Sequence, residues 1–207
     1  MLIRPNIVPN IKDNIHSDLD RNLFGTYSDG VQITTTKVGT FSMTLRGYAG
    51  TIKVNWRDGS PPEIVTLLGT STNVVVNHTY VLAGSKTIII TGDREKVTYF
   101  LCTYNNLYGD ISSLSYFINI NYINISYSSC TFLGATFTSL TIGPFWLRSV
   151  FSLAEYVDKI LIAFAAGGMH DCTLYLDGAN PAPSSDPDVV DAIATLLGNN
   201  VVLYVNT

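Results

Sequence analysis

Between residues 31 and 91 apolar and polar residues alternate with a period of two. The apolar positions of the two clearest runs are Phe41, Met43, Leu45, Ile52, Val54 and Trp56. Further β-rich runs cover residues 64–67, 74–76 and 87–91, and the intervening turn signals lie at 47–50, 58–62 and 83–85. Short strands separated by such turns are typical of a sandwich of two antiparallel sheets. The pattern therefore predicts a β-sandwich over residues 31–95.

From residue 96 to residue 207 the alternation gives way to an internal repeat of the form L-x-x-L-x-L-x-x-N-x-L. The first copy consists of Val97, Phe100, Cys102, Asn105 and Leu107, and the second consists of Ile120, Ile123, Ile125, Ser128 and Cys130. Later matches are Phe137, Leu140, Ile142, Phe145 and Leu147, then Val157, Ile160, Ile162 and Ala165. Shorter echoes follow at Leu174 and Leu176, and then at Leu203 and Val205.

Each copy of this repeat predicts one short strand whose alternate side chains point inward. Stacked copies share one continuous core that no single copy closes alone, which is the logic of a solenoid. Asn105 turns the chain and bonds exposed backbone groups, and later copies lack the asparagine. Cys102 and Cys130 fall on inward positions, so we interpret them as buried apolar residues.

The carboxyl terminus carries the signals of a helix followed by a strand. Asp186 is placed to cap a helix with Pro187 at its first position, and Gly198 stops it. Residues 201–205 then return as a strand. We expect this pair of elements to shield the last open face of the solenoid.

Residues 1–30 form a third segment. Pro5 and Pro9 make its beginning extended, and apolar residues at every fourth position favour a helix over residues 11–23. One interpretation is an arm that packs on its own body or on a partner chain. The alternative is a partly ordered leader.

Composition excludes several classes of protein. Charged residues make up 14% of the chain, against about 25% in ordinary soluble domains. The net charge of −4 argues against binding to nucleic acid, which needs clustered Lys and Arg. Three widely spaced cysteines encode neither a zinc site nor a redox pair. No segment reaches the length of a membrane span, and the first residues lack the apolar stretch of a signal peptide.

Three sequence elements resemble the polycystic-kidney-disease (PKD) type of immunoglobulin-like domain. They are the turn Val54-Asn55-Trp56-Arg57-Asp58-Gly59-Ser60, the element Asn77-His78-Thr79-Tyr80, and Gly84 with the strand Thr87-Ile88-Ile89-Ile90. The signature residues are Trp56, Asp58, Gly59, His78 and Tyr80. Arg57 replaces the first glycine of the family's turn, which leaves the turn conformation open but not the sandwich.

The carboxyl-terminal part is similar to leucine-rich repeat proteins of gut Bacteroidetes and of the phages that infect them. This resemblance lies in residues 174–184 and 199–207. The predicted fold class is accordingly mainly β, with an immunoglobulin-like β-sandwich, a short leucine-rich-repeat-like solenoid, and a capping helix and strand. Both families are commonly non-catalytic surface or virion modules, so the resemblance implies adhesion or assembly.

Candidate chemistry is sparse. His170, Asp171 and Cys172 invite a cysteine-hydrolase hypothesis, but neighbours on a strand point to opposite faces. Asp58 is a candidate cation ligand with Glu63 or Asp93, the alternative being a turn residue that bonds its own backbone. We predict no catalytic residue, no cofactor and no metal site.

Aromatic residues of the first two repeats form a candidate binding surface. They are Tyr104, Tyr108, Tyr116, Tyr122 and Tyr127. Exposed tyrosines suit contact with carbohydrate or protein, and the alternative is that many are half-buried packing residues.

The leading hypothesis is a phage virion protein, such as a capsid decoration, fibre or tail-associated subunit. Its arm would anchor it to other virion proteins, and it would be oligomeric in the assembly. The alternative is a bacterial cell-surface adhesin or glycan-binding module that binds a cell-surface glycan or protein. A hydrolase is the third hypothesis.

Overall fold

The structure is a computed structural model that describes residues 30–135, 137 and 143–207. Residues Val31–Thr207 form one compact unit. The predicted arm, with the helix predicted over residues 11–23, lies outside the described residues except for Gly30. The described unit is mainly β, as the sequence predicts, and its strands belong to one large mixed sheet.

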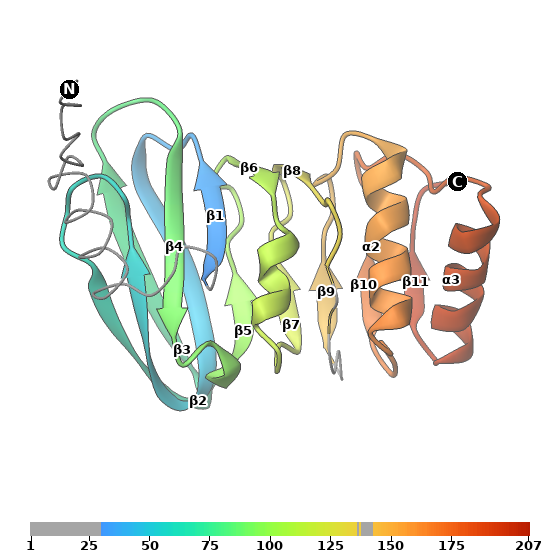
Figure 1. The fold of residues 1–207 in the computed structure, drawn as a ribbon, viewed down its shortest axis with the longest axis horizontal. Coiled ribbons are helices and arrows are strands. Elements are labelled where there is room, and N and C mark those ends of the chain that lie inside the picture. Colours follow the sequence, from blue (N-terminus) through green and yellow to red (C-terminus); the bar gives the residue numbers. More distant parts are fainter. Residues whose placement is uncertain (1–29, 136, 138–142) are drawn as a thin grey trace, which may run out of the picture. The chain divides into compact units, whose positions relative to one another are not determined.

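The amino-terminal part of this unit is antiparallel (Figure 1). Its strands are β1 (Val31–Thr35), β2 (Gly39–Asn55), β3 (Glu63–Tyr80) and β4 (Lys86–Gly92). Burial alternates along β2, where Phe41, Met43 and Leu45 are buried, so the predicted period of two is confirmed. β2 pairs with β3 along most of its length, and β1 pairs with β4.

The turn predicted at residues 47–50 is wrong. Here β2 continues as one strand and its register against β3 shifts between Leu45 and Gly47 and again between Gly47 and Gly50, as at a β-bulge. Gly47 allows the backbone of β2 to lie close to the backbone of Lys96, because a Cβ at this position would collide with the Lys96 carbonyl. β2 and β3 are therefore long continuous strands where the sequence predicts pairs of short ones.

The edge of β2 that does not pair with β3 pairs with two different strands. Residues 44–47 pair with β5 (Val97–Leu101), and residues 52–55 pair with β4. Because of this division the sheet continues in two directions, and its order is β11-β10-β9-β7-β5-β2-β4-β1-β6-β8, with β3 on β2.

One direction is a run of parallel strands, here called the parallel ladder. Its members are β5, β7 (Tyr122–Asn124), β9 (Pro144–Trp146), β10 (Thr173–Tyr175) and β11 (Val202–Tyr204). Their paired inward residues are Phe100, Ile123, Phe145, Leu174 and Leu203. The predicted equivalence of Phe100 and Ile123 in the first two copies is thus the observed register.

The other direction is shorter. β6 (Leu107–Asp110) pairs with β1 and, in parallel, with β8 (Ser129–Thr131), and Cys130 bridges to Phe151. Each turn of the chain from residue 97 to residue 151 therefore adds one strand or bridge to the parallel ladder and one to this second ladder.

Two later repeat matches are wrong in register or in kind. Phe145 pairs with Ile123, so it holds the second leucine position of its copy and not the asparagine position predicted for it. The match at residues 157–165 lies in the helix α2 (Ala154–Ala166). The buried face of this helix is formed by Val157, Ile160, Leu161 and Phe164, whereas Ile162 of the predicted copy is 39% exposed. Leu140 and Ile142 lie outside the described residues.

The predicted carboxyl-terminal elements are confirmed. Asp186 caps α3 (Pro187–Gly198) by accepting a hydrogen bond from the backbone N–H of Asp188 at 2.9 Å, and β11 follows. α2 and α3 cover the same side of the carboxyl-terminal strands in Figure 1. Two short 3₁₀ helices, η1 (Arg94–Lys96) and η2 (Ser112–Tyr116), complete the described elements.

A single hydrophobic core runs through the unit. It includes Trp56 and Phe41 from the antiparallel part and Phe100, Phe145 and Leu174 from the parallel ladder. The predicted boundary near residue 95 falls within this core, where β5 pairs with β2 and β6 pairs with β1.

Candidate functional site

The turns that follow β5, β7, β9 and β10 share one backbone feature. Tyr104, Tyr127, Ser149 and Gly178 have φ values of 56°, 63°, 54° and 80°. They occupy equivalent positions, because each is the fourth residue after the paired inward residue of its strand. A left-handed residue at this position turns the chain out of the parallel ladder.

At the first two turns the left-handed residue is a tyrosine. The rings of Tyr104 and Tyr127 stack with centroids 4.8 Å apart and planes 12° apart. Their exposed fractions are 63% and 52%. A left-handed conformation costs a residue with a side chain roughly 1–2 kcal/mol. The chain therefore displays this tyrosine pair in solvent despite a conformational cost.

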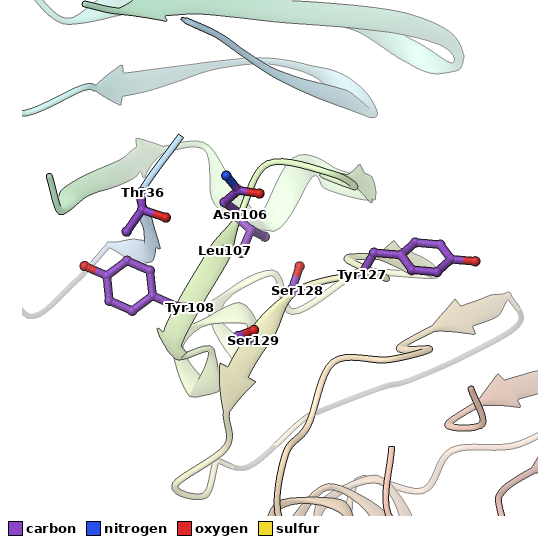
Figure 2. Close-up of a pocket in the computed structure, with 7 residues that line it drawn as sticks. All are labelled: Thr36, Asn106, Leu107, Tyr108, Tyr127, Ser128 and Ser129. Atoms are coloured by element: carbon purple, nitrogen blue, oxygen red, sulfur yellow. The ribbon is translucent and has the colours of Figure 1, made fainter. Parts of the chain in front are cut away.

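An open pocket of about 390 Å³ lies beside the tyrosine pair. Its lining residues are Thr36, Asn106, Leu107, Tyr108, Tyr127, Ser128 and Ser129. Figure 2 shows Tyr108 and Tyr127 on opposite sides of the view, with Ser128 and Ser129 between them. The lining supplies hydroxyl groups, an amide and aromatic rings, and it contains no charged side chain. Such a lining suits a neutral polar ligand.

The predicted tyrosines divide among three places. Tyr104, Tyr108 and Tyr127 belong to the pocket and the adjoining pair, and the hydroxyl of Tyr108 is hydrogen-bonded to Ser85 Oγ. Tyr122 stacks on Tyr99 with centroids 4.1 Å apart.

Tyr116 lies on η2, where its ring is 5.2 Å from the guanidinium carbon of Arg94. The candidate surface predicted from five tyrosines is therefore one cluster of three and two separate residues.

The outward face of the parallel ladder carries aromatic residues that the sequence analysis missed. The rings of Trp146 and Tyr175 stack at 3.9 Å, and those of Tyr175 and Tyr204 at 4.8 Å. The equal spacing of these three residues along the sequence is a signal that could have identified the row. Arg46 lies over Tyr99 at 4.1 Å on the same face. Burial and the neighbouring Tyr122 raise the pKa of Tyr99.

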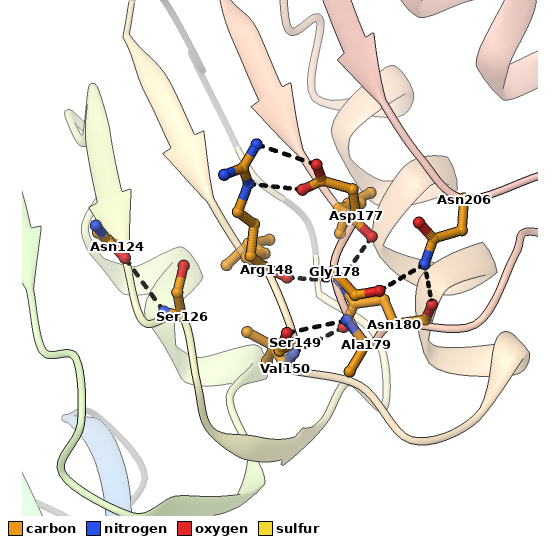
Figure 3. A network of polar contacts seen from close by, with 12 residues as sticks. Asn124, Ser126, Arg148, Ser149, Val150, Asp177, Gly178, Ala179, Asn180 and Asn206 are labelled. Atoms are coloured by element: carbon orange, nitrogen blue, oxygen red, sulfur yellow. Dashed lines mark hydrogen bonds and ion pairs between the residues drawn. The ribbon is translucent and has the colours of Figure 1, made fainter.

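An ion pair between Arg148 and Asp177, on the turns that follow β9 and β10, lies beside this row of aromatic rings. Nε and Nη2 of Arg148 lie 2.7 Å and 3.0 Å from the two carboxylate oxygens of Asp177. The guanidinium carbon of Arg148 is also 4.8 Å from the ring centroid of Tyr175. Figure 3 shows this pair bridging adjacent turns.

Asn180, which the repeat pattern did not identify, ties two turns together (Figure 3). Its Oδ1 accepts hydrogen bonds from the backbone N–H groups of Val150 and Phe151 at 2.7 Å and 2.8 Å. Its Nδ2 donates to the carbonyls of Leu147 and Leu176 at 2.6 Å and 2.7 Å. Asn180 is buried, so these four bonds satisfy its amide completely.

Asn105 bonds backbone groups of neighbouring segments in the same way, on the turn that follows β5. Its Nδ2 donates to the carbonyls of Ser42 and Thr103, and its Oδ1 accepts from the backbone N–H of Ser42. The turn asparagine predicted from the repeat thus joins the parallel ladder to β2.

The signature residues of the antiparallel part lie together. The ring of His78 stacks on Trp56 with centroids 4.5 Å apart, and its Nε2 lies 2.7 Å from Asp58 Oδ2. The hydroxyl of Tyr80 donates to the carbonyl of Trp56 at 3.3 Å, and Gly59 has a φ of 93°.

Asp58 is held by its own turn. Partial burial raises its pKa, but hydrogen bonds from Ser60 and His78 outweigh this effect and lower the pKa to about 2. Asp93, the second candidate cation ligand, accepts a hydrogen bond from the backbone N–H of Thr51. In the part of the chain that the structure describes, no three His, Cys, Asp or Glu side chains are grouped to hold a metal ion.

The geometry does not favour nucleophilic chemistry at residues 170–172. Asp171 bonds the ring of the partly exposed His170 and the amide of Asn200. Cys172 is buried, and burial raises the pKa of its thiol to about 11. A thiol with such a pKa is protonated near neutral pH and is a weak nucleophile.

Comparison with protein-family models, with curated proteins and with solved structures finds no match to this chain. Among the described residues no helix is both long and apolar enough to cross a membrane.

Proposed function

We propose that this chain is a non-enzymatic binding protein that contacts a neutral polar partner through the tyrosine pair and the adjoining pocket. The observation that carries the proposal is the exposed stack of Tyr104 on Tyr127 beside a pocket without charged groups. Aromatic rings with hydroxyl and amide groups recognise both sugars and polar protein surfaces.

The charge distribution supports a neutral partner. No Asp, Glu, Lys or Arg occurs between Asp110 and Arg148. Tyr127, Ser128 and Ser129 lie within this stretch. The pocket lining carries no fixed charge, and the nearby Lys37 donates its Nζ–H to the carbonyl of Tyr104 at 3.1 Å. Hydrogen bonding and ring contact therefore decide the specificity of the pocket.

The context we propose is a phage virion, in which the chain is a capsid decoration, fibre or tail-associated subunit. An immunoglobulin-like segment at residues 31–95 and a leucine-rich-repeat-like segment at 96–207 would suit such a role. Support comes from the Trp56–His78 contacts and from the recurrence of parallel strands from β5 to β10. In this proposal residues 1–30 anchor the chain to other virion proteins.

Mass spectrometry of gradient-purified particles tests the virion role. Particles of a phage whose genome encodes the chain should contain it in reproducible copy number. A chain that lacks residues 1–29 should be absent from the particles while still being made in the host. Recovery of the full chain only from the host cell envelope would overturn the virion role.

The alternative is a bacterial surface adhesin or glycan-binding module, which the neutral, hydroxyl-lined pocket favours. A glycan array probed with the full chain tests it, because binding should fall at least about tenfold on Tyr127→Ala. Tyr116→Ala is the matched control, since Tyr116 lies under Arg94 and outside the pocket. An array without signal from the full chain would reject this alternative.

A further inference from the structure

The parallel ladder ends in an open edge at β11. Among the described strands β11 pairs only with β10, so its second backbone edge has no strand partner there. The aromatic row ends at the same place: Tyr204 stacks on Tyr175 and is 45% exposed.

The core is also open at this end. The inward residues of the earlier ladder strands, such as Phe145 and Leu174, are fully buried, whereas Leu203 and Val205 are only partly buried. Exposed apolar side chains occur on the last helix and on β11, namely Val190 and Leu197 of α3 and Val202 of β11. The helix and strand predicted to shield the solenoid therefore leave an apolar surface of their own. Terminal repeats that remain in water normally carry a polar outer face.

The opposite limit of the sheet is β3, whose only strand partner in the described part of the chain is β2. β3 has 18 residues, and its one charged residue is Glu63 at its start. Ile64 and Leu68 are 62% and 66% exposed. Long edge strands are normally protected against pairing by lysines, prolines or short length. β3 has none of these, although its register against β2 shifts between Gly69 and Val74.

The amino-terminal half of the unit, which carries β3, and the carboxyl-terminal half, which carries β11, differ in net charge. Residues 31–96 contain seven Lys and Arg against four Asp and Glu, whereas residues 97–207 contain two against eight. Contact between two β11 ends would bring like charges together. Contact between a β11 end and a β3 end brings opposite charges together.

We propose that the β11 end of one molecule docks on the β3 edge of a second copy of this chain, so that the sheet continues from molecule to molecule. Such a contact is heterologous, because it uses a different surface on each copy, and it repeats until a ring closes or a fibre grows. The inference does not depend on the ligand of the pocket or on a virion role.

Sedimentation velocity of the purified full chain tests this contact. The mean mass should rise with protein concentration and fall with added salt. Val202→Lys blocks the β11 end and Leu68→Glu blocks the β3 edge, because a charge on an edge strand opposes pairing and each new charge matches the sign of the surface it would meet. Each variant alone should remain monomeric, and Ile118→Lys, at an exposed residue outside both edges, should associate like the unmodified chain.

Mixing the two blocked variants gives the decisive measurement. Each keeps one intact end, so an equimolar mixture should form a one-to-one dimer and nothing larger. Thermal unfolding of each variant checks that it is folded. A monomeric unmodified chain at all concentrations overturns the proposal. Self-association of Leu68→Glu, which would indicate contact between two β11 ends, also overturns it, and so does a mixture that stays monomeric.

Discussion

The rings of Tyr104 and Tyr127 stack at 4.8 Å although both residues have a left-handed backbone. Gly178 holds the equivalent position on a later turn, where no ring is presented. Conformation alone would favour glycine at every such turn. The two tyrosines are therefore best explained by the contact between their rings and, in the proposed function, by contact with a partner.

Replacing Tyr104 separates the stack from the backbone conformation. Tyr104→Ala should lower the free energy of unfolding by about 1 kcal/mol, because the ring contact is lost and the left-handed cost stays. Tyr104→Gly loses the same contact but removes the conformational cost, so it should be more stable than Tyr104→Ala by about 1 kcal/mol. Urea unfolding of both variants measures the difference. An alanine variant at least as stable as the glycine variant would contradict this explanation.

Asn180 should be among the most sensitive positions of the carboxyl-terminal turns. Asn180→Ala leaves two backbone N–H groups and two carbonyls without their buried partner. We expect the free energy of unfolding to fall by about 3 kcal/mol or more, since each unsatisfied buried group costs about 1–3 kcal/mol. Asn206→Ala is the control, because Asn206 is less buried and only donates to two carbonyls. An equal loss in both variants would show that burial at Asn180 is not decisive.

The alternation along β2 is predictable because it directly reports one buried face. The sandwich of two sheets predicted over residues 31–95 is not confirmed, since these strands belong to one mixed sheet. The bulge at Gly47 is not predictable, since a glycine that permits close approach looks the same in a sequence as a glycine in a turn. The helix cap at Asp186 is predictable because its signal is local. The helix over residues 157–165 is not predictable in this way, because an apolar spacing of three residues, as between Val157 and Ile160, fits both a repeat and a helix.

The candidate site is predictable in composition but not in arrangement. The register of the first two copies already aligns Tyr104 with Tyr127, but the sequence does not indicate the left-handed backbone that both residues have. The row of Trp146, Tyr175 and Tyr204 escaped prediction because the helices α2 and α3 lie between its members and lengthen its step beyond that of the first copies. The predicted register of the repeat is wrong from the copy in which this longer spacing begins.

Stability at low pH should depend on Asp58. The pKa of its carboxyl is about 2 in the folded chain, below its usual value of 3.8. A lowered pKa stabilises the fold above the usual value, and that stabilisation is lost as the pH falls from about 4 to about 2. Because Asp58 lies on an exposed turn and its carboxyl is only partly buried, solvent screens these bonds, and we expect less than about 1 kcal/mol.

Urea unfolding of Asp58→Asn against the unmodified chain measures this contribution. The variant should be less stable at pH 6, and the difference should shrink toward pH 2. Ser60→Ala should weaken the pH dependence, since Ser60 donates to Asp58 through both its hydroxyl and its backbone N–H and the variant keeps only the latter. A difference of equal size at pH 6 and pH 2 would contradict the assignment.

Arg148 should not tolerate lysine, although the charge is kept. Its guanidinium contacts both carboxylate oxygens of Asp177 and lies over the ring of Tyr175, and an ammonium group cannot do both. We expect Arg148→Lys to lower the free energy of unfolding by about 1 kcal/mol. The reverse exchange, Lys159→Arg, changes a cation that lies 5.8 Å from the Tyr156 ring and should have little effect. If Asp177→Asn removes the difference between arginine and lysine at position 148, the ion pair accounts for it; a difference that persists at full size would assign it to the aromatic row instead.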